Sequence, residues 1–348
     1  MPLLPSLTAV KLLWLGLLSV SCATLSAQVY KGAIVLNAAT GEILFEDRSD
    51  YQGPPASVTK LMTFLVIHDA IRDGELTLRT PIEVSAADSR MGGTQVWLKH
   101  REVFPVEELL YALMIQSAND AAHALSHAAG ITREQFVERM NIRARSLGMS
   151  DTIWRSPHGL HPRSRRLDET DQTSPRDLVK LAQALLRETD VLRFTSIEKR
   201  PFGTGVRAKP VMMDNHNNLI GKVRGIDGLK TGFTRAAGFC LVATARRDGQ
   251  RIITVIMGSP SSKERDIKMA ELIENAFAHL PRGPIQSMPE ANPITTTTEQ
   301  PAPSITPSPA PIVRPLQITP IDLEDDDESV RPSTSDDPPP TVKFELPY

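Results

Sequence analysis

Ser57 and Lys60 are side chains whose types and spacing suit nucleophilic catalysis. They stand three residues apart, between Pro55 and the apolar run 61–71. If a helix begins near Ser57, residues three apart lie on one face, so the hydroxyl can meet the amine. Serine is a poor nucleophile at its ordinary pKa, and a lysine whose pKa is lowered by burial or by a second cation can act as its base. The apolar run after Lys60 predicts such burial.

A second polar group, Ser117-Ala118-Asn119, interrupts a helical stretch between residues 114 and 121. A loop between two helices can present both side chains to a cleft. There a serine hydroxyl can relay a proton, and an asparagine amide can accept from a lysine and bind a peptide group. The alternative is that Ser117 and Asn119 only hydrogen-bond the local backbone.

A third group, Lys230-Thr231-Gly232, ends a predicted strand. An edge strand offers its backbone N–H and C=O groups to an extended peptide. Lys230 would add a positive charge for a carboxylate, Thr231 a hydroxyl donor, and Gly232 room for a substrate to approach the backbone. The alternative is a strand that ends in a turn glycine.

Histidines and arginines outside these groups carry weaker signals. His123 and His127 are four residues apart on a predicted helix, a spacing that suits a metal ion. The sequence reveals no third ligand, so we interpret them as a structural or exposed pair and expect neither a metal nor a cofactor. His216 is a candidate to line the cleft. The arginines of segment 163–166 are interpreted as solvated loop residues, with glycan contact as the alternative.

The hydrophobic pattern predicts the elements that must position these groups. A hairpin is predicted over 29–46 and a buried, nearly all-apolar helix over 61–71. Ser174-Pro175 has the serine-cap, proline-first pattern of a helix start. Further helices are predicted over 106–129, 132–147, 176–187 and 261–279, and strands over 225–232, 238–246 and 251–257. A sheet built from both chain ends predicts an α/β (α+β) domain whose central antiparallel sheet is flanked by helices.

The chain divides into an export segment, a domain and a tail. Residues 1–27 resemble a secretion signal that is cleaved after Ala27, with an uncleaved anchor or lipidation of Cys22 as alternatives. The predicted domain spans 28–280, and its lone Cys240 is expected to be a buried structural thiol. An exported, periplasmic or extracytoplasmic protein is therefore predicted.

Composition argues against a nucleic-acid-binding protein, because the 348 residues carry a formal charge of −2. Residues 281–348 hold 11 acids, 4 bases and 16 of the 28 prolines, so their net charge is −7 and the remainder carries +5. Such a segment cannot bury enough apolar surface to offset its ordering entropy, so we predict a disordered tail.

The three polar groups, in this order, form the signature of class A β-lactamases and penicillin-binding proteins. Over about residues 29–279, the chain resembles low-molecular-mass penicillin-binding proteins of the D-alanyl-D-alanine carboxypeptidase type. The resemblance implies their β-lactamase/transpeptidase-like fold. It rests on segments 55–63, 109–122 (LLYALMIQSANDAA), 156–160, 227–234 and 237–239.

The resemblance also implies roles for matching residues. Ser57 would be acylated, Lys60 would take its proton, and Ser117 would help pass that proton to the leaving D-alanine nitrogen. Asn119 would hold the substrate amide and Lys60. Lys230 and Thr231 would bind the terminal carboxylate beside Gly232, and backbone N–H groups of Ser57 and Phe233 would form the oxyanion hole.

The implied function is a serine D-Ala-D-Ala carboxypeptidase acting on peptidoglycan stem peptides, with β-lactams as covalent inhibitors. The second-motif region favours it over a D,D-endopeptidase that cuts crosslinks, although Lys230 serves both. A class A-like β-lactamase would need a deacylating glutamate in an E-x-x-L-N segment. No such segment lies between the second and third polar groups, although Glu169 and Glu188 lie in that part of the chain. A non-catalytic peptidoglycan-binding protein would have little reason to keep all three groups. The tail is too proline-rich for the second β domain or membrane helix of many relatives, so only an uncleaved N-terminus is expected to contact a membrane.

Overall fold

The computed structural model describes two stretches of the chain, residues 29–161 and 166–280. The predicted signal, the predicted tail, Arg163 and Arg165 lie outside these described residues. The described part is a mixed α/β domain with a central antiparallel sheet and flanking helices, which confirms the predicted fold class.

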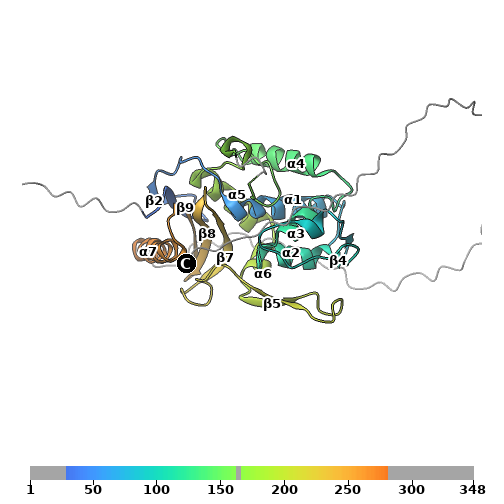
Figure 1. Cartoon of the computed structure of the whole chain (residues 1–348). Coiled ribbons are helices and arrows are strands. Elements are labelled where there is room, and N and C mark those ends of the chain that lie inside the picture. Colours follow the sequence, from blue (N-terminus) through green and yellow to red (C-terminus); the bar gives the residue numbers. More distant parts are fainter. Residues whose placement is uncertain (1–28, 162–165, 281–348) are drawn as a thin grey trace, which may run out of the picture. The chain divides into compact units, whose positions relative to one another are not determined.

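The central sheet has five strands in the order β2-β1-β9-β8-β7. Its strands are β1 (Gly32–Asn37), β2 (Ile43–Asp47), β7 (Ile226–Thr234), β8 (Gly238–Arg247) and β9 (Gln250–Ser259). β1 pairs with β9, from Gly32 opposite Met257 to Asn37 opposite Ile252. The sheet is therefore assembled from both chain ends, as predicted, and β7 is an edge strand (Figure 1).

Hydrophobic cores lie on both faces of this sheet. On one face, α1 (Lys60–Arg72) and α5 (Pro175–Glu188) share a core with sheet residues such as Val242 and Val255. On the other face, α7 (Ser262–His279) packs on residues such as Val35 and Ile256 (Figure 1). Central strands covered on both sides explain the unbroken apolar runs in their sequence. Ten of the 13 residues of α1 are buried, so the predicted central helix is confirmed.

The remaining elements lie between β2 and β7, and most of them are short. They are η1 (Ala56–Thr59), β3 (Pro81–Glu83), η2 (Asp88–Arg90), β4 (Val103–Pro105), α2 (Val106–Met114), α3 (Asn119–Leu125), α4 (Arg133–Ser146), η3 (Leu167–Glu169), α6 (Val191–Thr195), β5 (Lys199–Phe202) and β6 (Val211–Asp214). The predicted helical run 106–129 is thus two helices with the Ser117 group between them. The pairs β3-β4 and β5-β6 escape sequence prediction because they are short and three of the four strands contain a proline, which disfavours a strand assignment.

Helix caps fix where two of the longer helices begin. The Ser174 hydroxyl accepts from Asp177 N at 3.2 Å, and Pro175 opens α5, which confirms the predicted start. Thr132 and Gln135 form a reciprocal capping box at the start of α4.

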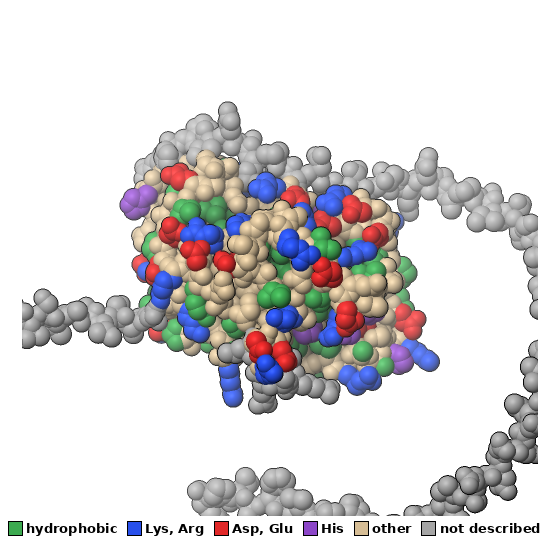
Figure 2. Space-filling model, turned by 90° about the horizontal axis from the view of Figure 1, so that it is seen from above, with side chains coloured by type: hydrophobic (Ala, Val, Ile, Leu, Met, Phe, Trp, Pro, Cys, Tyr) green, Lys and Arg blue, Asp and Glu red, His purple; other side chains and the backbone are tan. Residues whose placement is uncertain are grey.

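The surface of the described part carries both charges. Acidic and basic side chains are interspersed on the face that Figure 2 shows, so the mildly basic total forms no continuous basic stripe there. Several oppositely charged side chains form ion pairs, such as Arg251 and Asp227, whose nearest nitrogen and oxygen atoms are 2.8 Å apart. No helix within 29–161 and 166–280 combines the length and apolarity needed to cross a membrane.

Candidate active site

Ser57, Ser117 and Thr231 come from distant parts of the chain and line one pocket of about 300 Å³. Ser57 lies in η1, Ser117 in the link between α2 and α3, and Thr231 on β7. The remaining lining residues are Thr94, His216, Asn218, Gly232, Phe233, Phe239, Ser262 and Arg265. The structure therefore brings the three polar groups of the sequence to one place.

Lys60 is fully buried and makes three hydrogen bonds. Its Nζ donates to Ser57 Oγ at 3.0 Å, to Asn119 Oδ1 at 2.7 Å and to His158 O at 2.8 Å. Burial, followed by the positive charge of Lys230, holds the pKa of Lys60 well below its usual range. An amine that loses its proton easily thus lies within hydrogen-bond distance of a hydroxyl, which is the arrangement a base needs.

A 3-10 turn makes Ser57 and Lys60 face each other. The sequence predicts a helix start near Ser57, whereas η1 spans Ala56–Thr59 and α1 begins at Lys60. Side chains three residues apart eclipse in a 3-10 helix, so this turn aligns the hydroxyl and the amine more directly than an α-helix would.

The Asn119 side chain does not cap the helix that it begins. Its Oδ1 accepts from Lys60 Nζ, and its Nδ2 donates to Gly92 O at 2.8 Å, so the local-backbone alternative is wrong for this residue. Ser117 has a positive φ of 60°, a conformation that few non-glycine residues adopt. This backbone places the buried Ser117 at the pocket wall.

Lys230 lies on the edge strand β7 and is 2% exposed. Its Nζ donates to Thr231 O at 3.1 Å. Burial, and after it the charge of Arg265, lowers the pKa of Lys230 to about 7. An anionic ligand nearby would favour the charged form of Lys230, because opposite charges attract.

Arg265 and His216 complete the lining on this side. Sequence reasoning missed Arg265, although a signal exists: it shares the buried face of α7 with Met269, Leu272 and Ile273, where an arginine is unusual. His216, a candidate from the sequence, lines the pocket. Burial, then the charges of Lys230 and Lys60, lowers its pKa to about 4, so it is neutral near pH 7.

Gly232 lines the pocket, as expected of a residue that a substrate approaches, and it also serves the protein's own packing. A Cβ there would lie 2.4 Å from Pro55 O and 3.1 Å from the backbone nitrogen of Ser57. Only glycine lets β7 approach the nucleophile turn this closely. Phe233 follows at the rim, 52% exposed and stacked on Phe239.

The loop 156–160 supports the nucleophile turn, a role that the sequence did not reveal. His158 O accepts from Lys60, and Pro157 O accepts from Thr63 Oγ1 at 2.6 Å. The buried Asp171 carboxylate links loop and turn, accepting from Ser156 Oγ and Thr59 Oγ1, both at 2.9 Å. Burial raises the pKa of Asp171, while these donors favour its charged form.

Gly159→Ala should slow acylation of Ser57 at least about 10-fold. Gly159 has a φ of +84°, and a Cβ there would lie 2.0 Å from Ala56 O, so the loop or the turn must move. Gly130→Ala is the matched control, because Gly130 has a φ of +71° but open space around it. Thermal melts should show a comparable loss of stability in both variants, because each alanine has a positive φ. Kinetics with a fluorescent penicillin should show slow acylation in Gly159→Ala alone. Equal acylation rates would show that the loop does not hold the turn.

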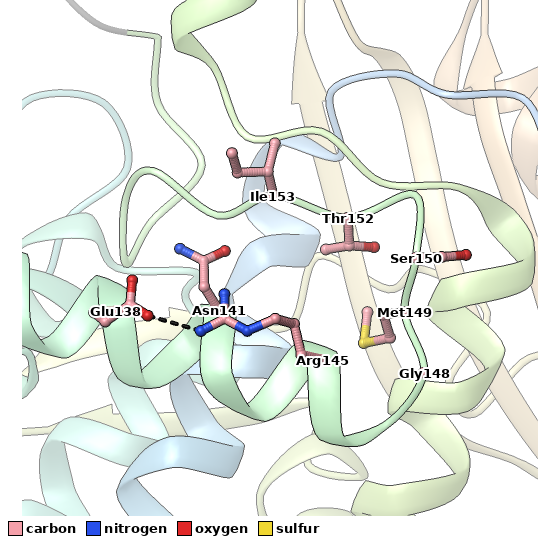
Figure 3. Close-up of a pocket in the computed structure, with 8 residues that line it drawn as sticks. All are labelled: Glu138, Asn141, Arg145, Gly148, Met149, Ser150, Thr152 and Ile153. Carbon is pink, nitrogen blue, oxygen red and sulfur yellow. Dashed lines mark hydrogen bonds and ion pairs between the residues drawn. The ribbon is translucent and has the colours of Figure 1, made fainter.

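A second hollow of about 530 Å³ lies beside α4 (Figure 3). The exposed ion pair of Glu138 and Arg145, at 2.8 Å, borders it. Asn141 there is engaged by the backbone of Trp154, which it contacts through both its amide nitrogen and oxygen. None of the three polar groups of the sequence lines this hollow.

Comparison with known proteins identifies the family of this chain. The sequence profile of the D-alanyl-D-alanine carboxypeptidase family, peptidase family S11, matches residues 19–261. D-alanyl-D-alanine carboxypeptidase DacF of Bacillus subtilis is 31% identical over 255 residues, which are 73% of this chain and 64% of the relative. A D-alanyl-D-alanine endopeptidase of Haemophilus influenzae is 33% identical over 60% of this chain and 68% of its own length. The chain thus spans less than two thirds of the Bacillus relative.

The fold gives the same assignment. The crystal structure of penicillin-binding protein D2 from Listeria monocytogenes, in its ampicillin-bound form, superposes with a TM-score of 0.64 and 29% identity. The match covers 72% of this chain and 97% of that one. The sequence match, the shared fold and the convergence of three polar groups on one pocket agree, and the chain belongs to the D-alanyl-D-alanine carboxypeptidase family of low-molecular-mass penicillin-binding proteins.

Proposed function

We propose that this protein is a serine D-alanyl-D-alanine carboxypeptidase, which removes the terminal D-alanine of peptidoglycan stem peptides through an acyl-enzyme on Ser57. The observation that carries the proposal is the 3.0 Å contact between Ser57 Oγ and the amine of Lys60, whose pKa burial lowers. This pair opens into the pocket that also contains Thr231 and Arg265.

Acylation moves one proton through these residues. Ser57 Oγ attacks the carbonyl carbon of the penultimate D-alanine while Lys60 accepts the hydroxyl proton. The C–N bond then breaks, and the proton passes from Lys60 through Ser117 to the nitrogen of the leaving D-alanine. A water molecule hydrolyses the resulting ester, giving its proton to the Lys60 amine, which returns it to Ser57 Oγ.

The substrate's terminal carboxylate is assigned to the basic side of the pocket. Arg265 lines the pocket there and Thr231 supplies a hydroxyl donor, while Lys230, buried on β7 beside Thr231, adds positive charge. Backbone N–H groups of Ser57 and Phe233 are proposed to stabilise the oxyanion of the tetrahedral intermediate. We also assign the substrate amide to Asn119, which hydrogen bonds with Lys60 and Gly92 O hold in place.

Crosslink cleavage is the second candidate, because a D,D-endopeptidase is among the similar proteins. A crosslink can present the same free carboxylate beside its scissile bond, so Lys230 serves both reactions. A β-lactamase is disfavoured, since neither Glu169 nor Glu188 lines the pocket. Glu188 instead pairs with Arg143. β-Lactams are therefore proposed to be covalent inhibitors rather than substrates.

Parallel digestion of two muropeptides tests the proposal. A monomer ending in D-Ala-D-Ala should release free D-alanine, and a crosslinked dimer should remain largely intact. Conversion of dimer to monomers without free D-alanine would make the protein an endopeptidase and overturn the preference. Lack of action on both substrates, without penicillin labelling, would indicate a non-catalytic binding protein.

Lys230→Ala should reduce kcat/KM for D-alanine release about 100-fold, because it removes a buried positive charge facing the carboxylate. It should also move the acid limb of the acylation pH profile to higher pH. The Lys230 charge lowers the pKa of Lys60, acylation requires neutral Lys60, and loss of that charge therefore raises the pH at which Lys60 becomes neutral.

Exposed Lys263, on the same helix as Arg265, gives the control variant Lys263→Ala. Both activity and pH profile should be unchanged in it. A Lys230→Ala profile that falls in amplitude but keeps its acid limb would contradict the electrostatic link to Lys60.

The protein is proposed to act outside the cytoplasm, where peptidoglycan is found. We also propose that residues 1–27 direct export, that 28–280 form the peptidase domain and that 281–348 form an extended tail. Protease mapping and N-terminal sequencing of the exported protein test these boundaries, with a mature N-terminus at Gln28 expected.

A further inference from the structure

Asp88, His123 and His127 converge outside the pocket. Asp88 lies in η2, His123 on α3 and His127 one turn further along the chain. His123 Nδ1 is 2.5 Å from Asp88 Oδ1, and His127 Nε2 is 3.0 Å from Asp88 Oδ2. The candidate ligand atoms all lie within 4.8 Å of one another. The structure thus supplies the third ligand that the sequence did not reveal.

We propose that these three side chains form a Zn²⁺ site, with water in a fourth position. Two imidazole nitrogens and one carboxylate oxygen are the donor set of open, three-ligand zinc sites. Nitrogen donors also favour zinc over Mg²⁺ and Ca²⁺, which prefer oxygen.

The geometry requires only a small adjustment to admit the ion. Zinc bonds of about 2.05 Å at tetrahedral angles place ligand atoms about 3.3 Å apart. The observed separations from the carboxylate oxygens to the imidazole nitrogens are 2.5 to 3.2 Å, so these pairs need to open by less than about 1 Å, while the two imidazole nitrogens lie within 4.8 Å of each other. Rotation about the side-chain bonds of His127, which is 32% exposed, can provide this.

The surroundings suit a divalent cation. The Asp88 carboxylate is fully buried, and among the described residues its ion-pair partners are these two histidines, with no lysine or arginine. A metal ion binds imidazoles through neutral nitrogens, and its positive charge would compensate the buried Asp88 carboxylate. Ser85 N donates to Asp88 Oδ2 at 2.7 Å and fixes the carboxylate, as supporting hydrogen bonds do around metal ligands.

The site has a clear place in the fold. η2 leads into the segment 91–98, which Asn119 holds through Gly92 O and Thr94 O. Thr94 lines the pocket, and Asn119 begins the helix that carries His123. An ion held by Asp88 and the histidines would tie this segment to α3. The competing account is that His127 carries a proton and pairs with Asp88 without a metal ion. The hydrogen bond to Asp88 raises the pKa of His127, which favours that protonated form.

Metal titration of the untagged, chelator-treated protein separates the two accounts. We expect one Zn²⁺ per chain by calorimetry and elemental analysis, with affinity in the micromolar range or tighter, and no comparable binding of Mg²⁺ or Ca²⁺. Co²⁺ should give the visible bands of a tetrahedral site. Zinc in about 100-fold excess over Kd should raise Tm by about 5 °C.

Variants locate the ion. His123→Ala and His127→Ala should each weaken Zn²⁺ binding at least about 100-fold and remove the Tm increase. His279→Ala, at an exposed histidine of α7, is the matched control and should bind as wild type does. Penicillin labelling verifies that each variant is folded. Asp88→Asn keeps the size of the buried residue and should also lose the ion. No stoichiometric binding, or binding unaffected by His127→Ala, would overturn the proposal and leave the Ser57 chemistry untouched.

Discussion

Ser57→Ala should reduce D-alanine release at least about 10⁴-fold. The residue supplies the protein atom that forms a covalent bond with the substrate in the proposed mechanism, and alanine leaves Lys60 with no hydroxyl to deprotonate. The change removes one oxygen from the pocket wall, so the hydrogen bonds of Lys60 to Asn119 and His158 should survive. Release of D-alanine, followed by a coupled amino-acid oxidase assay, measures the loss.

A matched serine variant separates chemistry from folding. Ser150 is exposed and outside the active-site pocket, so Ser150→Ala should keep wild-type activity. Melting temperatures of both variants should lie within a few degrees of the parent. Residual hydrolysis above about 1% in a well-folded Ser57→Ala protein would mean that another group is the nucleophile.

Lys60→Ala should slow acylation about 1,000-fold, within the range for loss of a positioned general base. The variant removes the amine 3.0 Å from Ser57 Oγ and leaves Asn119 Oδ1 and His158 O without their buried donor. Stopped-flow labelling with a fluorescent penicillin measures the rate of ester formation directly.

Because those unpaired acceptors also destabilise the protein, the test needs a readout specific to the base. The space left by the side chain should admit a small amine such as ethylamine, which should restore part of the acylation rate in Lys60→Ala and none in Ser57→Ala. Exposed Lys222 gives the control variant Lys222→Ala, with unchanged kinetics expected. A wild-type rate in folded Lys60→Ala would contradict the role of Lys60.

Sequence alone predicts those parts of the site that are local in the chain. Ser57 and Lys60 are one helical turn apart, and the apolar run behind them predicts the burial of α1. The sheet is also predictable, because β8 and β9 are rich in apolar and β-branched residues and are joined by a tight turn. Short motifs and long periodic segments therefore carry enough information by themselves.

Contacts between distant segments are not predictable in this way. His158 O holds Lys60 from 98 residues away, and Asp171 holds the turn from 112 residues away. These groups are a backbone carbonyl and an ordinary loop aspartate, which no local pattern marks. Gly232 was expected to lie beside a substrate, and the sequence did not reveal that Pro55 O also requires a glycine there. Asp88 likewise gains a meaning only when η2 packs beside α3.

Peptide mapping after brief exposure to benzylpenicillin tests the central claim most directly. Intact-mass measurement should show one adduct per chain, and proteolysis with tandem mass spectrometry should place it on Ser57. The adduct should persist for many minutes, because no carboxylate lines the pocket among the described residues to activate a deacylating water. An adduct on any other residue, or an unchanged adduct in Ser57→Ala, would contradict the account of this protein as a Ser57 acyl-enzyme.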